Sequence, residues 1–322
     1  MEMRLRCNGI DMKKFAAVFP GQGSQFVGMF ASFMEDPIVN ATYDEAGEAL
    51  GYDLRSLTLN GPEEELNRTE ITQPAILTAS VAAFRALREK AGDPACVAGH
   101  SLGEYSALVA AGVLEFKDAV RLVRLRGQAM QEAVPAGRGA MAAVLGLDDQ
   151  VIIDNCKMAA EESGHGVWAA NFNTPGQVVI SGSSEGVKKA SELLAQAGAR
   201  RVVPLAVSAP SHCPLMQSAA DRLQEALKEI KVCDAKIPVY SNAYAKPESA
   251  AEEIVKALVL QLTGPVRWAQ TVTEMKKAGV EVLVETGPNK VLSGMVRRID
   301  KTLGAANVCD PESLSKTLEI LN

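Results

Sequence analysis

The sequence predicts an α/β protein with a mainly parallel sheet and a smaller unit inserted into it. Short apolar runs that end in polar loops alternate with helical stretches, as they do in parallel sheets. The order of predicted strands and helices changes after the segment VPAGRG and returns to the earlier pattern after residue 205. The length of 322 residues, with 47% hydrophobic and 22% charged residues, suits two folded units and excludes a disordered chain.

Four apolar runs, each followed by polar loop residues, predict the strands of the parallel sheet: residues 15–19, 95–98, 238–240 and 280–284. Helices are expected between them, over residues 75–90, 102–111 and 118–134. We expect residues 69–74 to form the turn that leads into the first of these helices.

The inserted unit begins where Pro135, Gly137 and Gly139 end a long helix. From residue 140 the pattern predicts a strand, a helix over 148–162, two strands joined by a turn at 174–176, a helix over 184–197 and a last strand. This β-α-β-β-α-β order is ferredoxin-like. Because such a unit closes on itself, we assign three parts: an N-terminal extension (1–14), a large domain (15–137 and 206–322) and an inserted subdomain (138–205).

Charge and cysteine content exclude several classes of protein. The 33 basic and 39 acidic residues give a net charge of -6, which argues against nucleic acid or an anionic membrane as partner of the whole surface. The six cysteines lie far apart and form no CxxC or zinc-ligand pair, so we expect reduced thiols and a cytoplasmic protein. No segment has the pattern of a secretory signal or a membrane span. We expect Met12 to be the natural start and assign no function to residues 1–11.

The clearest chemical motif is Gly99-His100-Ser101-Leu102-Gly103, a G-x-S-x-G sequence. An apolar run precedes it and a helical stretch follows it, which is the strand, turn and helix context of a nucleophilic serine. Free N–H groups at the start of that helix suit a developing oxyanion. We therefore predict Ser101 as the nucleophile, against the alternative of a tight turn without a chemical role.

A serine nucleophile needs a base, and the chain has three histidines. We expect His100 to point away from the serine hydroxyl and pack behind the site, and His165 to lie in a solvated loop. His212 follows a strand-like run and is therefore the predicted base, with a capping or core histidine as the alternative. The neighbouring Cys213 is expected to fill space.

Arg126 stands where an apolar residue is expected. One face of the helix over residues 118–134 is apolar, and Arg126 falls near its middle. A buried guanidinium needs a carboxylate, several carbonyl groups or an anionic ligand. An internal carboxylate and a substrate carboxylate, which a guanidinium binds in bidentate fashion, both stay open on this pattern.

Taken together, the motifs GQGSQ, TQPA, GHSLGEYSAL, PSHC, QLTGPVRW and ETGPNKVL and the helix that carries Arg126 closely resemble the malonyl-CoA:acyl carrier protein transacylases. The resemblance runs from about residue 14 to residue 300. It implies the fold of this family, a hydrolase-like sheet with a ferredoxin-like insertion. It also implies a malonyl transfer from coenzyme A to the phosphopantetheine thiol of acyl carrier protein, in fatty acid biosynthesis, through a malonyl-serine and without cofactor or metal.

The resemblance assigns roles to particular residues. It implies that Ser101 and His212 are the catalytic pair and that Arg126 binds the malonyl carboxylate. It also implies that the backbone N–H groups of Gln22 and Leu102 form an oxyanion hole. The backbone carbonyl of Gln261 is expected to orient the histidine, and the side chain of Gln73 is expected to line the pocket.

The acyl carrier proteins of this pathway are acidic, so a net-negative enzyme needs a local basic surface to bind one. Four residues of the segment KVLSGMVRRIDK are candidates: Lys290, Arg297, Arg298 and Lys301. An ordinary solvated helix face explains them equally well. We expect the protein to act as a monomer.

Two other functions compete with this one. An ordinary α/β serine hydrolase has the same serine turn, but it places an acid and then a histidine late in the chain, whereas 110 residues follow His212. A non-catalytic binding module for acyl-CoA or carrier protein has no need to keep Ser101, His212 and Arg126 together.

Overall fold

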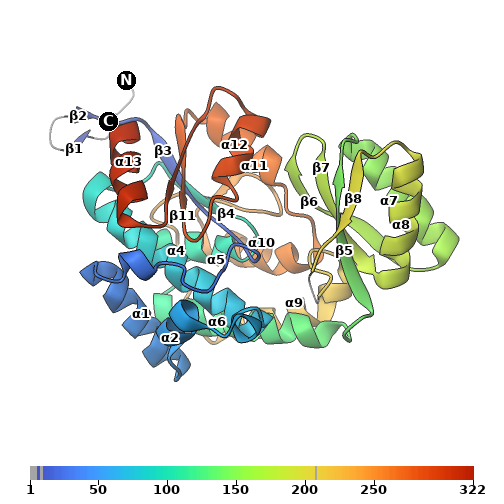
Figure 1. Cartoon of the computed structure of the whole chain (residues 1–322), viewed down its shortest axis with the longest axis horizontal. Coiled ribbons are helices and arrows are strands. Elements are labelled where there is room, and N and C mark those ends of the chain that lie inside the picture. The colour runs from blue at the N-terminus through green and yellow to red at the C-terminus, as the bar shows by residue number, and fades with distance from the viewer. Residues whose placement is uncertain (1–5, 8–9, 207–208) are drawn as a thin grey trace.

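The computed structural model, which describes residues 6–7, 10–206 and 209–322, contains a large sheet, a small sheet and flanking helices (Figure 1). A short antiparallel pair near the N-terminus is formed by β1 (Arg6–Cys7) and β2 (Ile10–Asp11). The segment that follows lies against the C-terminal helix, since the Lys13 backbone N–H donates to the carbonyl of Leu321. None of the described helices is long and apolar enough to cross a membrane.

The large sheet has six strands in the order β10-β9-β4-β3-β11-β12. Five are parallel, and β10 pairs antiparallel at the edge. Their bounds are Phe15–Phe19 (β3), Cys96–Gly99 (β4), Val239–Tyr240 (β9), Pro247–Glu248 (β10), Val282–Thr286 (β11) and Gly304–Val308 (β12). The four predicted strands are β3, β4, β9 and β11.

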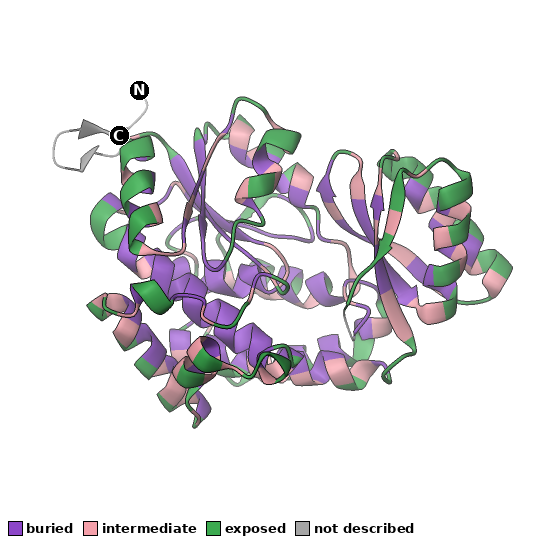
Figure 2. Cartoon of the chain, in the orientation of Figure 1, coloured by how far each residue is buried: buried purple, intermediate pink, exposed green. Residues whose placement is uncertain are grey.

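Both faces of this sheet are covered, which explains why its strands are apolar throughout (Figure 2). Phe15, Ala17 and Phe19 face a core shared with α4, while Ala16 and Val18 face a second core shared with α11 and α12. The helices in chain order are Pro37–Leu50 (α1), Leu54–Asn60 (α2), Glu63–Leu66 (α3), Thr69–Ala91 (α4), Gly103–Ala110 (α5), Phe116–Ala133 (α6), Gln217–Lys228 (α9), Ala251–Thr263 (α10), Trp268–Lys277 (α11), Ser293–Ile299 (α12) and Pro311–Leu321 (α13).

The small sheet is antiparallel, in the order β6-β7-β5-β8. Its elements follow the predicted order, with the bounds Gly139–Leu145 (β5), Asp149–Ser163 (α7), Val167–Thr174 (β6), Gln177–Ser183 (β7), Ser184–Gln196 (α8) and Arg201–Pro204 (β8). Both helices cover one face (Figure 1). The predicted fold class, a mainly parallel sheet domain with a ferredoxin-like insertion, is confirmed.

The geometry of the large sheet determines where a site forms. In parallel strands the carboxyl ends meet at one edge, so the loops after β3, β4, β9 and β11 converge. The small sheet is joined to the large unit near this edge by Val266, whose N–H donates to Ala170 and whose carbonyl accepts from Phe172.

Residues 69–74 differ from the prediction. They are the first turns of α4 rather than a turn before it, and Pro74 lies inside the helix. Pro74 cannot donate a hydrogen bond to the carbonyl of Glu70, and its ring crowds that carbonyl; the extensive burial of α4 offsets this cost. Strands β10 and β12 were not predicted; β12 has the sequence GAANV, whose small residues carry little strand signal.

Candidate active site

Ser101 lies in a sharp turn between β4 and α5, with a backbone φ of 53°. This left-handed conformation is costly for a residue with a side chain, and such strain is typical of functional sites. The turn requires glycine on both sides. A Cβ at Gly99 would lie 1.9 Å from the backbone of Gly103, and one at Gly103 would lie 2.0 Å from the carbonyl oxygen of Phe19.

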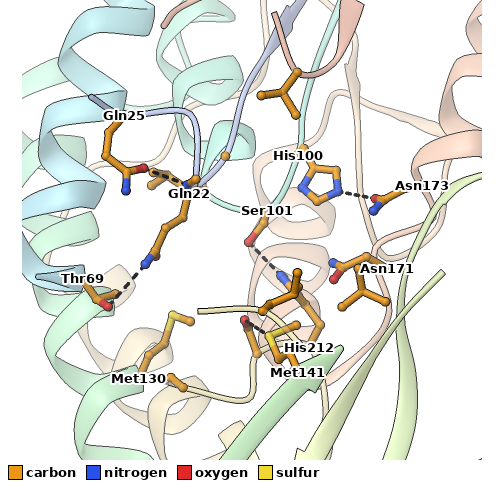
Figure 3. A pocket seen from close by; sticks show the side chains of 18 of the residues that line it. Gln22, Gln25, Thr69, His100, Ser101, Met130, Met141, Asn171, Asn173 and His212 are labelled. Carbon is orange, nitrogen blue, oxygen red and sulfur yellow. Dashed lines mark hydrogen bonds between the residues drawn. The ribbon is translucent and has the colours of Figure 1, made fainter. Parts of the chain in front are cut away.

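Ser101 faces a cavity of about 460 Å³ between the two sheets. Figure 3 shows its walls: Gln22, His100 and Ser101 come from the large unit, while Met141 and Asn171 come from strands of the small sheet. The cavity therefore depends on both units.

His212 is the base partner of Ser101. Its Nε2 lies 2.8 Å from the Ser101 hydroxyl, and its Nδ1 lies 2.8 Å from the backbone carbonyl of Gln261. Because a carbonyl only accepts, Nδ1 carries the proton and Nε2 is free to accept the serine proton. Burial, followed by the positive charge of Arg126, lowers the pKa of His212 to about 3, so the imidazole is neutral and its Nε2 is unprotonated.

Arg126 is a buried charge of the site, with an exposed fraction of 1%. Its Nη2 donates to the Ser101 hydroxyl at 3.2 Å and to Gln261 Oε1 at 3.1 Å, and its Nη1 donates to Gln73 Oε1 at 2.9 Å. The guanidinium also lies over the ring of Tyr105, and its Nε has no hydrogen-bond partner in the described chain. Within the same residues no carboxylate forms a salt bridge with the guanidinium, so a direct internal carboxylate partner is not found; the buried Glu104 is linked to it only through the Gln261 side chain and through its charge.

Two glutamines hold this arginine. Gln73 was expected to line the pocket, but it is not among the cavity-lining residues: it is wholly buried in α4 and accepts a hydrogen bond from Arg126. Gln261 has a role beyond its carbonyl, because its side chain contacts Arg126 and also donates Nε2 to the carbonyl of Ser101 at 2.9 Å.

The positions expected for an oxyanion hole flank the nucleophile. Gln22 and Leu102 both line the cavity. In the described chain the backbone N–H groups of these two residues have no acceptor, so they are available to a ligand.

His100 differs in part from the prediction. It does not contact the serine hydroxyl, but it lines the cavity instead of packing behind it, since its Nε2 lies 2.8 Å from Asn173 Oδ1 (Figure 3). Burial lowers the pKa of His100. His165 is exposed, and Cys213 is fully buried with its thiol donating to the carbonyl of Pro210.

Two residues of the site were missed from the sequence. Asn242 accepts the Ser101 N–H at 2.7 Å and donates to the carbonyl of Gly99 at 2.6 Å. Glu104 is buried beneath the site and accepts from the Gln261 side chain. Both carried a signal: Asn242 follows a predicted strand at the sheet edge, and Glu104 is a charge at the start of an apolar helix.

The four basic candidates lie around α12, outside the cavity, and all are exposed. Val291, Leu292 and Met295 line the cavity, so this helix begins at its mouth. In the described part of the chain no group of three or more His, Cys, Asp or Glu residues is placed to hold a metal ion.

The neutral state of His212 is testable by NMR of histidine-labelled protein. The His212 imidazole should stay neutral from about pH 8 to about pH 5, with its proton on Nδ1, because burial disfavours the charged form. The signal is assigned by its loss in His212→Gln. An imidazolium that forms with a midpoint near pH ~6.5 would contradict this environment.

The chain is similar to known proteins in sequence and in fold. The family model described as acyl transferase domain matches residues 17–314. A malonyl CoA-acyl carrier protein transacylase of Haemophilus influenzae is 54% identical over 313 residues, which cover 96% of this chain and 100% of the relative.

Solved structures show the same similarity. A malonyl CoA-acyl carrier protein transacylase from Coxiella burnetii has a TM-score of 0.94 at 45% identity and covers 96% of this chain and 98% of its own. A malonyl-transacylase in complex with its type II PKS acyl-carrier protein has a TM-score of 0.92 at 53% identity, with 95% and 99% covered. The chain therefore belongs to the acyl transferase family, among the malonyl CoA-acyl carrier protein transacylases.

Proposed function

We propose that this enzyme transfers a malonyl group from coenzyme A to the phosphopantetheine thiol of acyl carrier protein, through a malonyl ester on Ser101, in fatty acid biosynthesis. The observation that carries the proposal is the position of Arg126. A buried guanidinium without a carboxylate partner lies 3.2 Å from the hydroxyl of a serine that is already paired with a base. An acyl group that ends in its own carboxylate supplies the missing charge.

In the first half-reaction, His212 Nε2 takes the proton of the Ser101 hydroxyl as the oxygen attacks the thioester carbonyl. The developing oxyanion receives hydrogen bonds from the N–H groups of Gln22 and Leu102. When the C–S bond breaks, the imidazolium gives its proton to the coenzyme A thiolate.

The second half-reaction runs through the same groups in reverse. His212 takes the proton of the carrier thiol, and the thiolate attacks the malonyl ester. The C–O bond to Ser101 then breaks, and its oxygen recovers the proton from His212. Arg126 holds the malonyl carboxylate throughout.

Intact mass spectrometry after mixing with malonyl-CoA tests the nucleophile. The protein should gain one malonyl group, and Ser101→Ala should gain none, because the Ser101 hydroxyl is the group that contacts His212 Nε2. His212→Ala should slow the labelling. Label that survives in Ser101→Ala would eliminate Ser101 as the nucleophile.

Arg126→Ala should impair malonyl transfer far more than acetyl transfer. A charge-assisted contact in a buried site contributes about 1.5 to 3 kcal/mol, so the malonyl-to-acetyl ratio of kcat/KM should fall by about ten- to a hundredfold. The measurement is kcat/KM for both acyl-CoA substrates, together with the melting temperature.

Arg121→Ala is the matched control, since Arg121 lies on the same helix with an exposed side chain. The malonyl-to-acetyl ratio of kcat/KM in Arg121→Ala should equal that of the wild type. An unchanged ratio in Arg126→Ala, or a parallel loss for both substrates with a lower melting temperature, would show that Arg126 only stabilises the fold.

We also propose that Lys290, Arg297, Arg298 and Lys301 bind the acidic carrier protein. Their exposure and their place beside a helix that begins at the cavity mouth support this role. A solved relative was captured with an acyl-carrier protein, which makes such a partner reasonable here.

Reversing Arg297 and Arg298 to Glu should raise the KM for the carrier protein and leave labelling by malonyl-CoA intact, because only the larger partner reaches this surface. The two KM values are measured on the same preparation. Equal loss for both substrates would point to damage of the fold instead.

The remaining assignments are proposals of the same kind. We propose a cytoplasmic monomer that needs no cofactor beyond its two substrates, and domain boundaries at 137/138 and 205/206. The spacing of the cysteines supports the compartment. The separate cores of the two sheets support the boundaries.

A further inference from the structure

Glu104 is a buried carboxyl group for which the reaction described above has no use. It lies in the first turn of α5, three positions after the nucleophile, and its exposed fraction is 1%. A buried carboxyl group is costly unless it is hydrogen-bonded, so its partners indicate what it stabilises.

Both partners of Glu104 belong to the active site. Its Oε2 accepts the Gln261 side-chain N–H at 2.8 Å and the Asn242 backbone N–H at 3.2 Å. Gln261 in turn contacts Arg126, and Asn242 accepts the N–H of Ser101.

The Gln261 amide has only one orientation that satisfies its neighbours. Its Oε1 accepts from Arg126, while its Nε2 donates both to the carbonyl of Ser101 and to Glu104. A flipped amide would place N–H groups against the arginine donors and an oxygen against two acceptors. In a flipped amide, Gln261 Oε1 would face the Glu104 carboxyl oxygen, so Glu104 disfavours the flip.

We propose that Glu104 is a positioning residue: by accepting the Gln261 N–H it keeps Gln261 Oε1 facing Arg126, and so holds the guanidinium where the substrate carboxylate arrives. This inference rests on the proposed malonyl transfer. Burial raises the pKa of Glu104 to about 7, so near neutral pH the group contributes hydrogen-bond acceptance whether or not it is ionised.

The test is a double-mutant cycle between Glu104 and Gln261. Glu104→Ala should lower the malonyl-to-acetyl ratio of kcat/KM by about tenfold or more, since Arg126 loses its orienting acceptor. In a Gln261→Ala background, which keeps the backbone carbonyl for His212, the same change should add no loss beyond about twofold. Glu104→Gln should restore the ratio, because its amide oxygen accepts the same hydrogen bonds.

Glu285→Ala is the matched control for the loss of a buried carboxyl group. Glu285 is also fully buried and also accepts two N–H groups, from Leu292 and Ser293, but it has no contact with Ser101, Gln261 or Arg126. It should lose stability, and any disturbance of the cavity wall at Leu292 should affect malonyl and acetyl transfer alike, so the malonyl-to-acetyl ratio should be kept. If Glu104→Ala does not fold, Glu104→Asp, which withdraws the carboxyl group from Gln261, should show the same loss of ratio.

The outcomes separate this inference from the proposed function. A wild-type protein that takes no malonyl label overturns the proposed function. A wild type that is labelled, with an unchanged ratio in the folded Glu104 variants or with additive losses in the cycle, leaves the function standing and overturns the positioning role.

Discussion

The buried guanidinium of Arg126 beside the Ser101 hydroxyl is the interaction on which the rest of the site depends. A charge removed from water needs partners on every side. The fold supplies amide oxygens, a hydroxyl and an aromatic ring, and within the described chain no carboxylate bonds the guanidinium directly, since Glu104 reaches it only through Gln261. The protein thus keeps a buried positive charge only partly compensated. In the proposed function, a substrate carboxylate completes the arrangement, and this one residue makes a general acyl-transfer site selective for an acidic acyl group.

The same charge affects the base. The low pKa of His212 is due first to burial and then to Arg126, so a bound carboxylate that compensates Arg126 also makes the imidazole a better proton acceptor. A neutral carbonyl orients His212 where many serine enzymes use an acid. The neutral Gln261 carbonyl at His212 and the positive charge of Arg126 therefore act together on the basicity of the imidazole.

Local sequence patterns predicted the parts of the structure that local chemistry controls. The strand and turn around Ser101, the inserted β-α-β-β-α-β unit and the inward position of Arg126 all follow from spacing and periodicity. The contacts of Asn242 and Gln261 with Ser101 span 141 and 160 positions, so no local pattern contains them. Gln73 was expected to line the cavity and is buried against Arg126, whereas His100 was expected behind the site and lines the cavity. The sequence pattern gives the face of an element but not the depth of a side chain. Glu104 carries the same sequence signal as Arg126, a charge on an apolar helix, so the pattern also indicates its burial.

The central claim is that Ser101 carries the acyl group while Arg126 binds its carboxylate. A crystal structure of the protein after reaction with malonyl-CoA tests this most directly. We predict continuous density from the Ser101 oxygen to a malonyl group whose carboxylate accepts hydrogen bonds from the Arg126 guanidinium. A malonyl group attached to another residue, or one whose carboxylate points away from Arg126 into solvent, would contradict the account.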